Sequence, residues 1–145
     1  MRRTLLFIFF LLVAEVLVTG IGEAGVKKTI RFSPGSDFAT VQESVIRGER
    51  DIYCITAKAG QTLEVSISAV EQNAVFSVFQ PGTVAEDKDG FTEINGKALP
   101  GAGETDDAAK WKGTLPVTGK YLIVVGGTRG NATYKLKVAI RQASH

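Results

Sequence analysis

Apolar and polar residues alternate one by one in several runs after residue 25, and this alternation limits the fold more than any other feature. Leu63, Val65 and Ile67 are separated by single polar residues, and lysines alternate with apolar residues after Tyr134. A period of two places apolar side chains on one face of a β-strand. No stretch after residue 25 keeps a helical spacing for more than a turn or two, so we expect an all-β fold.

Eight such runs are predicted to form strands, because β-branched and aromatic residues fill them and Gly, Pro, Asn or Asp separates them. They cover residues 26–32, 38–45, 51–57, 62–70, 74–79, 109–115, 120–126 and 133–140. About eight short strands at hairpin spacing favour a two-layer antiparallel β-sandwich. A chain of 145 residues is long enough for one domain with a core, and we expect a single β-sandwich domain over residues 25–145.

The first 24 residues have the pattern of a secretory signal peptide. Two arginines precede an apolar run over residues 5–14, and a Gly-Glu-Ala sequence ends at Ala24. The apolar run is roughly half of the ~20 residues that cross a bilayer, and Glu15 follows it directly. We therefore expect cleavage after Ala24, a periplasmic or secreted location, and no membrane association of the processed chain.

Charge and chemistry-bearing residues exclude several classes of function. The 17 Lys and Arg residues and 15 Asp and Glu residues are spread along the chain without a basic run, so nucleic acid is not an expected partner. The single histidine, His145, is the last residue, where a chain end holds no catalytic geometry. The single cysteine, Cys54, allows no internal disulfide and is expected to be a small buried hydrophobe. We expect no catalytic residue, no metal and no cofactor.

A segment between two runs, residues 81–107, is rich in Gly, Asp and Glu and is expected to be a solvated acidic loop. Its Asp-Lys-Asp-Gly sequence resembles part of a calcium loop. Aligning Gly90 with the invariant glycine of such loops puts Ala85 at the first ligand position and Gly96 where the bidentate Glu belongs. The calcium interpretation therefore lacks its two best ligands.

Carboxylates are plentiful, so the sequence leaves open a small hydrolase that uses two of them, as glycosidases do. Only their separation in space decides this. A module that binds another macromolecule without catalysis is the preferred interpretation.

Three sequence pieces carry a resemblance to known families: Trp-Lys-Gly-Thr-Leu-Pro-Val-Thr-Gly-Lys-Tyr at 111–121, Ala-Gly-Gln-Thr-Leu at 59–63 and Gln-Pro-Gly at 80–82. The chain resembles the bacterial periplasmic inhibitors of g-type lysozyme, and also the pre-peptidase C-terminal domains. Both families are β-sandwiches. The first resemblance implies a lysozyme as protein partner, and the second implies a module that binds a polysaccharide or protein surface without inhibition.

The inhibitor resemblance also implies a partner-binding site. Thr118, Gly119, Lys120 and Tyr121 match the family's Ser-Gly-x-Tyr loop with Thr in place of Ser, and Arg129 matches the arginine of a Thr-Arg pair after the next strand. In this interpretation a protruding hairpin loop carries hydroxyls and a cation into the muramidase cleft, where they bind the catalytic carboxyl groups.

Each of these residues also has a structural interpretation. Thr-Gly is an ordinary hairpin turn, Tyr121 fits a core aromatic with a bonded hydroxyl, and Arg129 fits a solvated loop residue. Trp111 is expected in the core, because it shares a strand face with Leu115.

Overall fold

The structure, a computed structural model, describes residue 25 and residues 27–142. The expected signal peptide and His145 lie outside these residues. Ten strands are present in the described part: β1 (Lys27–Thr29), β2 (Phe38–Val45), β3 (Arg50–Ala57), β4 (Thr62–Ala69), β5 (Ala74–Phe79), β6 (Val84–Lys88), β7 (Phe91–Asn95), β8 (Lys110–Thr114), β9 (Gly119–Gly127) and β10 (Ala132–Arg141).

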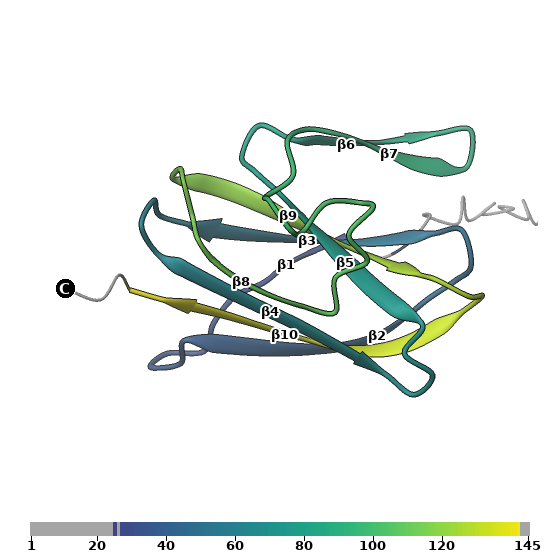
Figure 1. Ribbon diagram of the computed structural model, residues 1–145, viewed down its shortest axis with the longest axis horizontal. Coiled ribbons are helices and arrows are strands. Elements are labelled where there is room, and N and C mark those ends of the chain that lie inside the picture. The colour runs from purple at the N-terminus through teal and green to yellow at the C-terminus, as the bar shows by residue number, and fades with distance from the viewer. Residues whose placement is uncertain (1–24, 26, 143–145) are drawn as a thin grey trace, which may run out of the picture.

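Two four-stranded sheets pack face to face, as the alternating sequence predicts (Figure 1). The first sheet has the order β1-β3-β9-β5, and the second has the order β2-β10-β4-β8. Every pairing within these two sheets is antiparallel except the short β1, which runs parallel to β3. The expected two-layer β-sandwich is confirmed.

The main core lies between the two sheets. Leu63 and Val65 of β4 and Leu136 and Val138 of β10 all face it and are at most 1% exposed, so the predicted inward face of these strands is correct. Trp111 of β8 packs at the margin of the same core, and Leu115 is buried in it. The polar residues that alternate with these apolar residues along the strands face outward.

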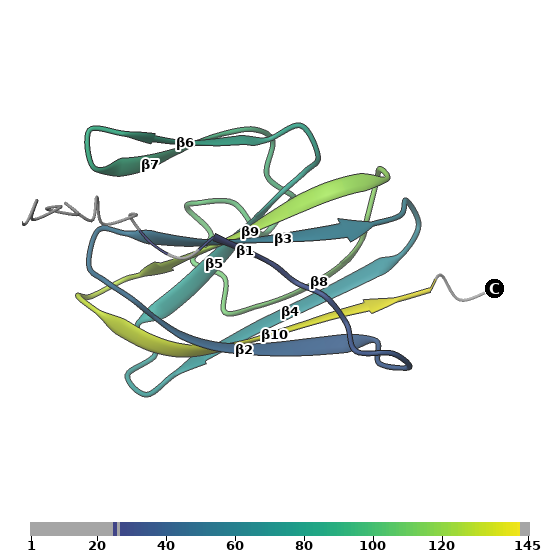
Figure 2. The same ribbon diagram turned by 180° about the vertical axis from the view of Figure 1, so that it is seen from behind.

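The segment over residues 81–107 is not the solvated loop that its composition predicts. β6 and β7 form a separate antiparallel hairpin that covers the outer face of the first sheet (Figures 1 and 2). Ala85 and Ile94 of the hairpin pack against a second apolar cluster, formed by four residues of the sheet. These are Ile52, Phe79, Leu122 and Val124. β9 is therefore buried on both faces along Tyr121–Val125, in contrast to the alternating strands β4 and β10.

An ion pair ties the hairpin to the first strand. The Lys27 ammonium lies 2.7 Å from the Asp87 carboxylate, which also accepts a 2.8 Å hydrogen bond from the Thr92 hydroxyl. These contacts, with Lys27 first, lower the pKa of the Asp87 carboxyl. Asp87 belongs to the Asp-Lys-Asp-Gly sequence that resembles part of a calcium loop. Its carboxylate binds the Lys27 ammonium in this structure.

Two structural properties of the described residues bear directly on function. Within residues 27–142, no three His, Cys, Asp or Glu side chains come together closely enough to hold a metal ion. The same part of the chain has no helix long and apolar enough to cross a bilayer. Cys54 is a free thiol that lies beside the second apolar cluster and is half-buried, so it is less enclosed than expected.

Candidate functional site

The loop between β8 and β9 carries the first part of the predicted site. Thr118 is exposed, but its Oγ1 accepts a 2.9 Å hydrogen bond from the backbone N–H of Ala59 in the neighbouring turn. Gly119 pairs with Ala57 at the start of β9 and has a φ of +152°. A Cβ at Gly119 would lie 2.8 Å from the ring of Pro81, so the close approach of these two segments requires glycine.

Tyr121 is placed inside the sandwich and not on the surface of the loop. Its side chain is fully buried, and its hydroxyl donates a 2.6 Å hydrogen bond to the carbonyl oxygen of Val117. The same hydroxyl accepts a 3.3 Å hydrogen bond from the N–H of Val117. Tyr121 therefore holds the loop from within, and the interpretation as a core aromatic with a bonded hydroxyl fits the geometry. Lys120 is exposed beside it.

Arg129 lies at the other end of the molecule from this loop. β9 has nine residues at about 3.3 Å each, so Thr118 and Arg129 are separated by roughly 30 Å. The five residues of the predicted site thus form two groups at opposite ends of the sandwich. A single hairpin cannot present all five to one partner, because β9 intervenes between them.

Three turns gather around Arg129, and we call them together the three-turn end. They are residues 46–49 between β2 and β3, 70–73 between β4 and β5, and 128–131 between β9 and β10. Side chains connect them. The Asn131 Oδ1 accepts a 2.8 Å hydrogen bond from the N–H of Arg47, and Asn73 Nδ2 donates to the Asn131 carbonyl at 2.9 Å.

Arg129 itself is held in the same network. Its Nη2 donates a 2.7 Å hydrogen bond to the carbonyl oxygen of Glu71, while the side chain as a whole stays exposed. The N–H of Thr128 donates to the Asn73 carbonyl at 2.8 Å. These hydrogen bonds therefore hold the three turns together in the free protein. They also fix the orientation of the Arg129 guanidinium.

Two large apolar side chains are exposed at this end. Val70 is 97% exposed and Ile46 is 55% exposed, next to the cationic side chains of Arg47 and Arg129. Arginine is enriched at protein interfaces, and exposed apolar side chains beside it add area that a partner can bury. Little in the sequence pointed to Ile46 or Val70, because each simply follows the last residue of a strand; the Arg-Gly and Asn-containing turns nearby were the available signal.

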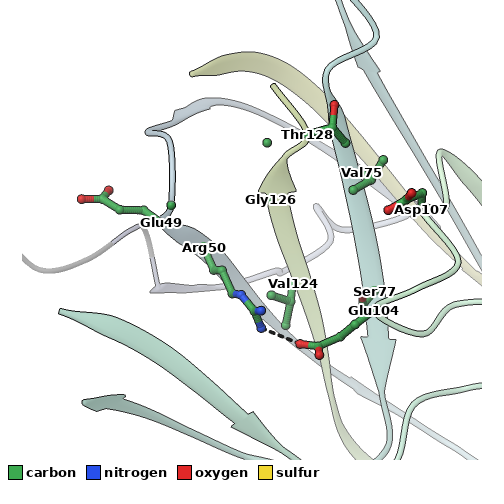
Figure 3. A pocket seen from close by; sticks show the side chains of 11 residues that line it. Glu49, Arg50, Val75, Ser77, Glu104, Asp107, Val124, Gly126 and Thr128 are labelled. Atoms are coloured by element: carbon green, nitrogen blue, oxygen red, sulfur yellow. Dashed lines mark hydrogen bonds and ion pairs between the residues drawn. The ribbon is translucent and has the colours of Figure 1, made fainter. Parts of the chain in front are cut away.

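A pocket of about 460 Å³ opens beside the three-turn end, on the face of the first sheet (Figure 3). The Arg50 guanidinium and the Glu104 carboxylate form an ion pair of 2.5 Å across one side of it. Glu49 also lines the pocket, but its side chain points away from Glu104 (Figure 3). These two carboxylates do not face each other as the acid and base of a glycosidase do.

A buried chain of hydroxyl groups underlies the same end. The hydroxyls of Tyr53 and Tyr134 lie 2.6 Å apart, and Tyr134 donates a 2.6 Å hydrogen bond to the Asp51 carboxylate, which is 1% exposed. Burial raises the pKa of Tyr53 to about 12. Burial, with the hydrogen bond to Asp51, also raises the pKa of Tyr134. Both tyrosines are therefore neutral hydrogen-bonding groups at physiological pH.

No protein-family model and no curated protein sequence matches the chain. Solved structures do match it. The periplasmic inhibitor of g-type lysozyme from Aeromonas hydrophila, PliG, has 32% sequence identity and a TM-score of 0.59, with 80% of this chain and 96% of that chain covered.

Two further PliG structures are similar. The Salmonella Typhimurium protein has 26% identity and a TM-score of 0.56 over 81% of this chain and 99% of its own. A mutant of the Escherichia coli protein has 25% identity and a TM-score of 0.58 over 81% of this chain and all of its own. The likeness thus spans essentially the whole of each inhibitor. This chain belongs to the family of periplasmic inhibitors of g-type lysozyme.

Proposed function

We propose that this chain is a periplasmic or secreted inhibitor of a g-type lysozyme, and that it covers the enzyme's cleft with its three-turn end. Its membership of the PliG family supports the activity and the location. The choice of surface rests on one observation: Arg129 is exposed, oriented and surrounded by turns that brace each other.

The chemistry of the target favours a guanidinium at the contact. Glycoside hydrolases of this kind act through carboxyl groups that flank the scissile bond. Arginine presents a planar fork of donors that binds a carboxylate through two parallel hydrogen bonds. One donor of Arg129 is bound to Glu71, which fixes the side chain and leaves the other donors for a partner.

The rigidity of the three-turn end also supports its role as the binding surface. Binding is weakened by the entropy lost when loops and side chains become ordered, so a preformed surface binds more tightly than a flexible one. The hydrogen bonds from Arg47 to Asn131 and from Asn73 to Asn131 fix the turns in the free protein. Val70 and Ile46 then supply apolar area around the cation.

The Thr118–Lys120 loop is the weaker surface, although the family resemblance names it. Thr118 and Tyr121 both use their hydroxyls in hydrogen bonds within the protein. Lys120 is the one side chain of that group with an exposed charge. We therefore assign this loop a structural role, and keep Lys120 as its test residue.

The activity is tested by measuring lysis of bacterial cells by a g-type lysozyme with increasing amounts of the purified chain. Inhibition that saturates near a one-to-one ratio is the expected result. A c-type lysozyme serves as the control for selectivity. If a large molar excess protects no cells from the g-type enzyme, the proposed activity is wrong.

A further inference from the structure

The outer face of the second sheet is open in the described part of the chain, because the β6–β7 hairpin covers the first sheet only (Figures 1 and 2). Four lysines of two strands project from this face: Lys110 and Lys112 of β8, and Lys135 and Lys137 of β10. All four are exposed. We call this surface the lysine face.

Strand register brings these lysines together. Lys137 lies opposite Ser66 of β4, and Ser66 lies opposite Lys110 of β8. Two strand spacings of about 4.8 Å put the backbones of Lys137 and Lys110 roughly 10 Å apart, and residues two apart on one strand are separated by about 7 Å. The lysines therefore form a compact grid, although 22 positions lie between Lys112 and Lys135 in the sequence.

The charge of this grid is not balanced by acids. Glu64, opposite Lys112, is the only acidic residue in the outward set of β4, β8 and β10. Arg141 of β10 is also on this face but forms an ion pair with Asp37, so the four lysines and Glu64 leave three positive charges in surplus, against a formal net charge of +2 for the whole chain. Within residues 27–142, none of the four lysines makes an ion pair, whereas Lys27, Lys28 and Lys88 each do.

The rest of the face is mainly polar, and shallow hollows lie beside Lys110 and Lys112 and beside Lys135. Hydroxyl side chains stand between and beside the lysines, and Ser44 and Thr133 hydrogen-bond to each other at 2.8 Å. Two large apolar side chains lie at its margin: Val70 beside Lys135, and Phe38 under the Lys137 ammonium, which is 4.9 Å from the ring centroid. Like charges gathered on one face of a sheet repel each other, and an anionic partner would relieve this repulsion.

The spacing limits what this ligand can be. The four lysines are based on a grid of roughly 7 by 10 Å, so several anions presented together match the whole face better than one phosphate does. A linear nucleic acid fits poorly, because the lysines form a grid and not a row and no exposed aromatic row offers stacking to bases. An array of phosphate groups side by side fits the spacing of the lysines.

We infer that the lysine face holds the protein against an anionic phospholipid surface. This differs from the expectation of no membrane association, which rested on removal of the signal peptide and on an apolar run too short to cross a bilayer. The three-turn end lies at the tips of the strands and the lysine face along their sides (Figure 1), so a surface-bound molecule keeps that end free.

The test is co-sedimentation of the chain from residue 25 onward, which contains every described strand, with two kinds of vesicle: phosphatidylcholine alone, and phosphatidylcholine mixed with phosphatidylglycerol. Binding to the mixed vesicles only, and its loss at high salt, is the expected result. Each lysine near an anionic surface contributes roughly fivefold in affinity. The double variant Lys135→Gln, Lys137→Gln is therefore expected to bind about 30-fold more weakly.

The matched control is the double variant Lys58→Gln, Lys97→Gln, which removes the same charge from exposed positions outside the lysine face. It is expected to lose less than about threefold, since attraction decays within a Debye length of the membrane. Equal losses in the two double variants overturn the inference, as does binding to soluble polyphosphate without binding to vesicles. Lysozyme is absent from this experiment, so its outcome is independent of the proposed inhibition.

Discussion

Tyr134 donates its hydroxyl hydrogen to the carboxylate of Asp51 at 2.6 Å, beneath the three-turn end, where Asp51 is 1% exposed. Hydrogen bonds to a buried charged group are among the stronger ones, and losing such a donor leaves the carboxylate less well solvated. The pair connects β3 of the first sheet with β10 of the second. It therefore holds the two sheets in register near the candidate binding surface.

Replacing Tyr134 with Phe is expected to lower the free energy of unfolding by about 1.5–3 kcal/mol. Urea titration followed by circular dichroism measures this. The comparison variant is Tyr53→Phe, which removes a hydroxyl bonded to Tyr134 and not to the carboxylate itself. It is expected to lose about 1 kcal/mol. If Tyr53→Phe loses as much stability as Tyr134→Phe, the hydrogen bond to the Asp51 carboxylate is not stronger than the one between the two hydroxyls.

The same two tyrosines predict a loss of stability at alkaline pH. Above about pH 10 a tyrosine of the unfolded chain loses its proton, whereas Tyr53, with its pKa raised to about 12, keeps it in the folded chain. The unfolded state then binds fewer protons, so the free energy of unfolding falls as the pH rises. Below about pH 10 the contribution is complete.

Tyr53 is expected to contribute a fall of roughly 1.4 kcal/mol per pH unit between about pH 10 and pH 12. Unfolding titrations at a series of pH values in this window measure the slope. The Tyr53→Phe variant should show a shallower slope than the natural chain. Identical slopes would show that this tyrosine does not ionise preferentially in the unfolded state.

Gly119 allows a sharp test of the loop next to Thr118. A Cβ at this position would lie 2.8 Å from Pro81, and overpacking of this kind costs about 1–3 kcal/mol. Gly119→Ala is therefore expected to destabilise the fold by that amount. Gly126→Ala, on the same strand, is the matched control, because a Cβ there meets nothing within 4 Å. Thermal unfolding measures the stability of the two variants. Equal stability would mean that Pro81 moves readily to accommodate the added methyl group.

Trp111 is the only tryptophan of the chain, which makes its packing visible by fluorescence. Its Nε1 donates a 2.9 Å hydrogen bond to the Pro100 carbonyl, and its ring covers Gly113. A Cβ at Gly113 would lie 2.5 Å from the ring, so Gly113→Ala is expected to displace the indole and move its emission to longer wavelength. Thr114→Ala, at the next and exposed position, should leave the emission unchanged.

The sandwich could be predicted because the alternation of apolar residues is clean where a strand covers the main core. β2 and β5 have the bounds expected from the sequence, β3 and β4 differ by one residue at one end, and β8, β9 and β10 differ by one residue at each end. β6 and β7 were missed for a physical reason. Only Ala85 and Ile94 of that hairpin pack on the sheet, so two apolar contacts among many acids give no readable alternation.

The site was harder to predict than the fold. Thr118 and Arg129 lie 11 positions apart in sequence, close enough to suggest one loop, but β9 stretches between them as an extended strand. The lysine face shows the opposite effect. Lys110 and Lys137 are distant in sequence, but both lie opposite Ser66 on the strand between them. Both outcomes depend on strand pairing, which local sequence patterns do not specify.

The two ends of β9 give contrasting predictions for lysozyme binding. Arg129→Ala is expected to raise the concentration needed for half-inhibition of a g-type lysozyme by about 30-fold or more, as truncation of an interface arginine does at a binding hot spot. Lys120→Ala, at the other end, is expected to change it by less than about threefold. Arg129→Lys keeps the charge without the planar fork and should fall between them.

Each of these variants is first checked by urea unfolding, because Arg129 also bonds to the Glu71 carbonyl within the three-turn end. A variant that unfolds like the natural chain but inhibits poorly has lost a contact with the enzyme. If Lys120→Ala abolishes inhibition and Arg129→Ala does not, the enzyme is held by the loop between β8 and β9. That result would leave the inhibitory activity in place and move its surface to the opposite end of the sandwich.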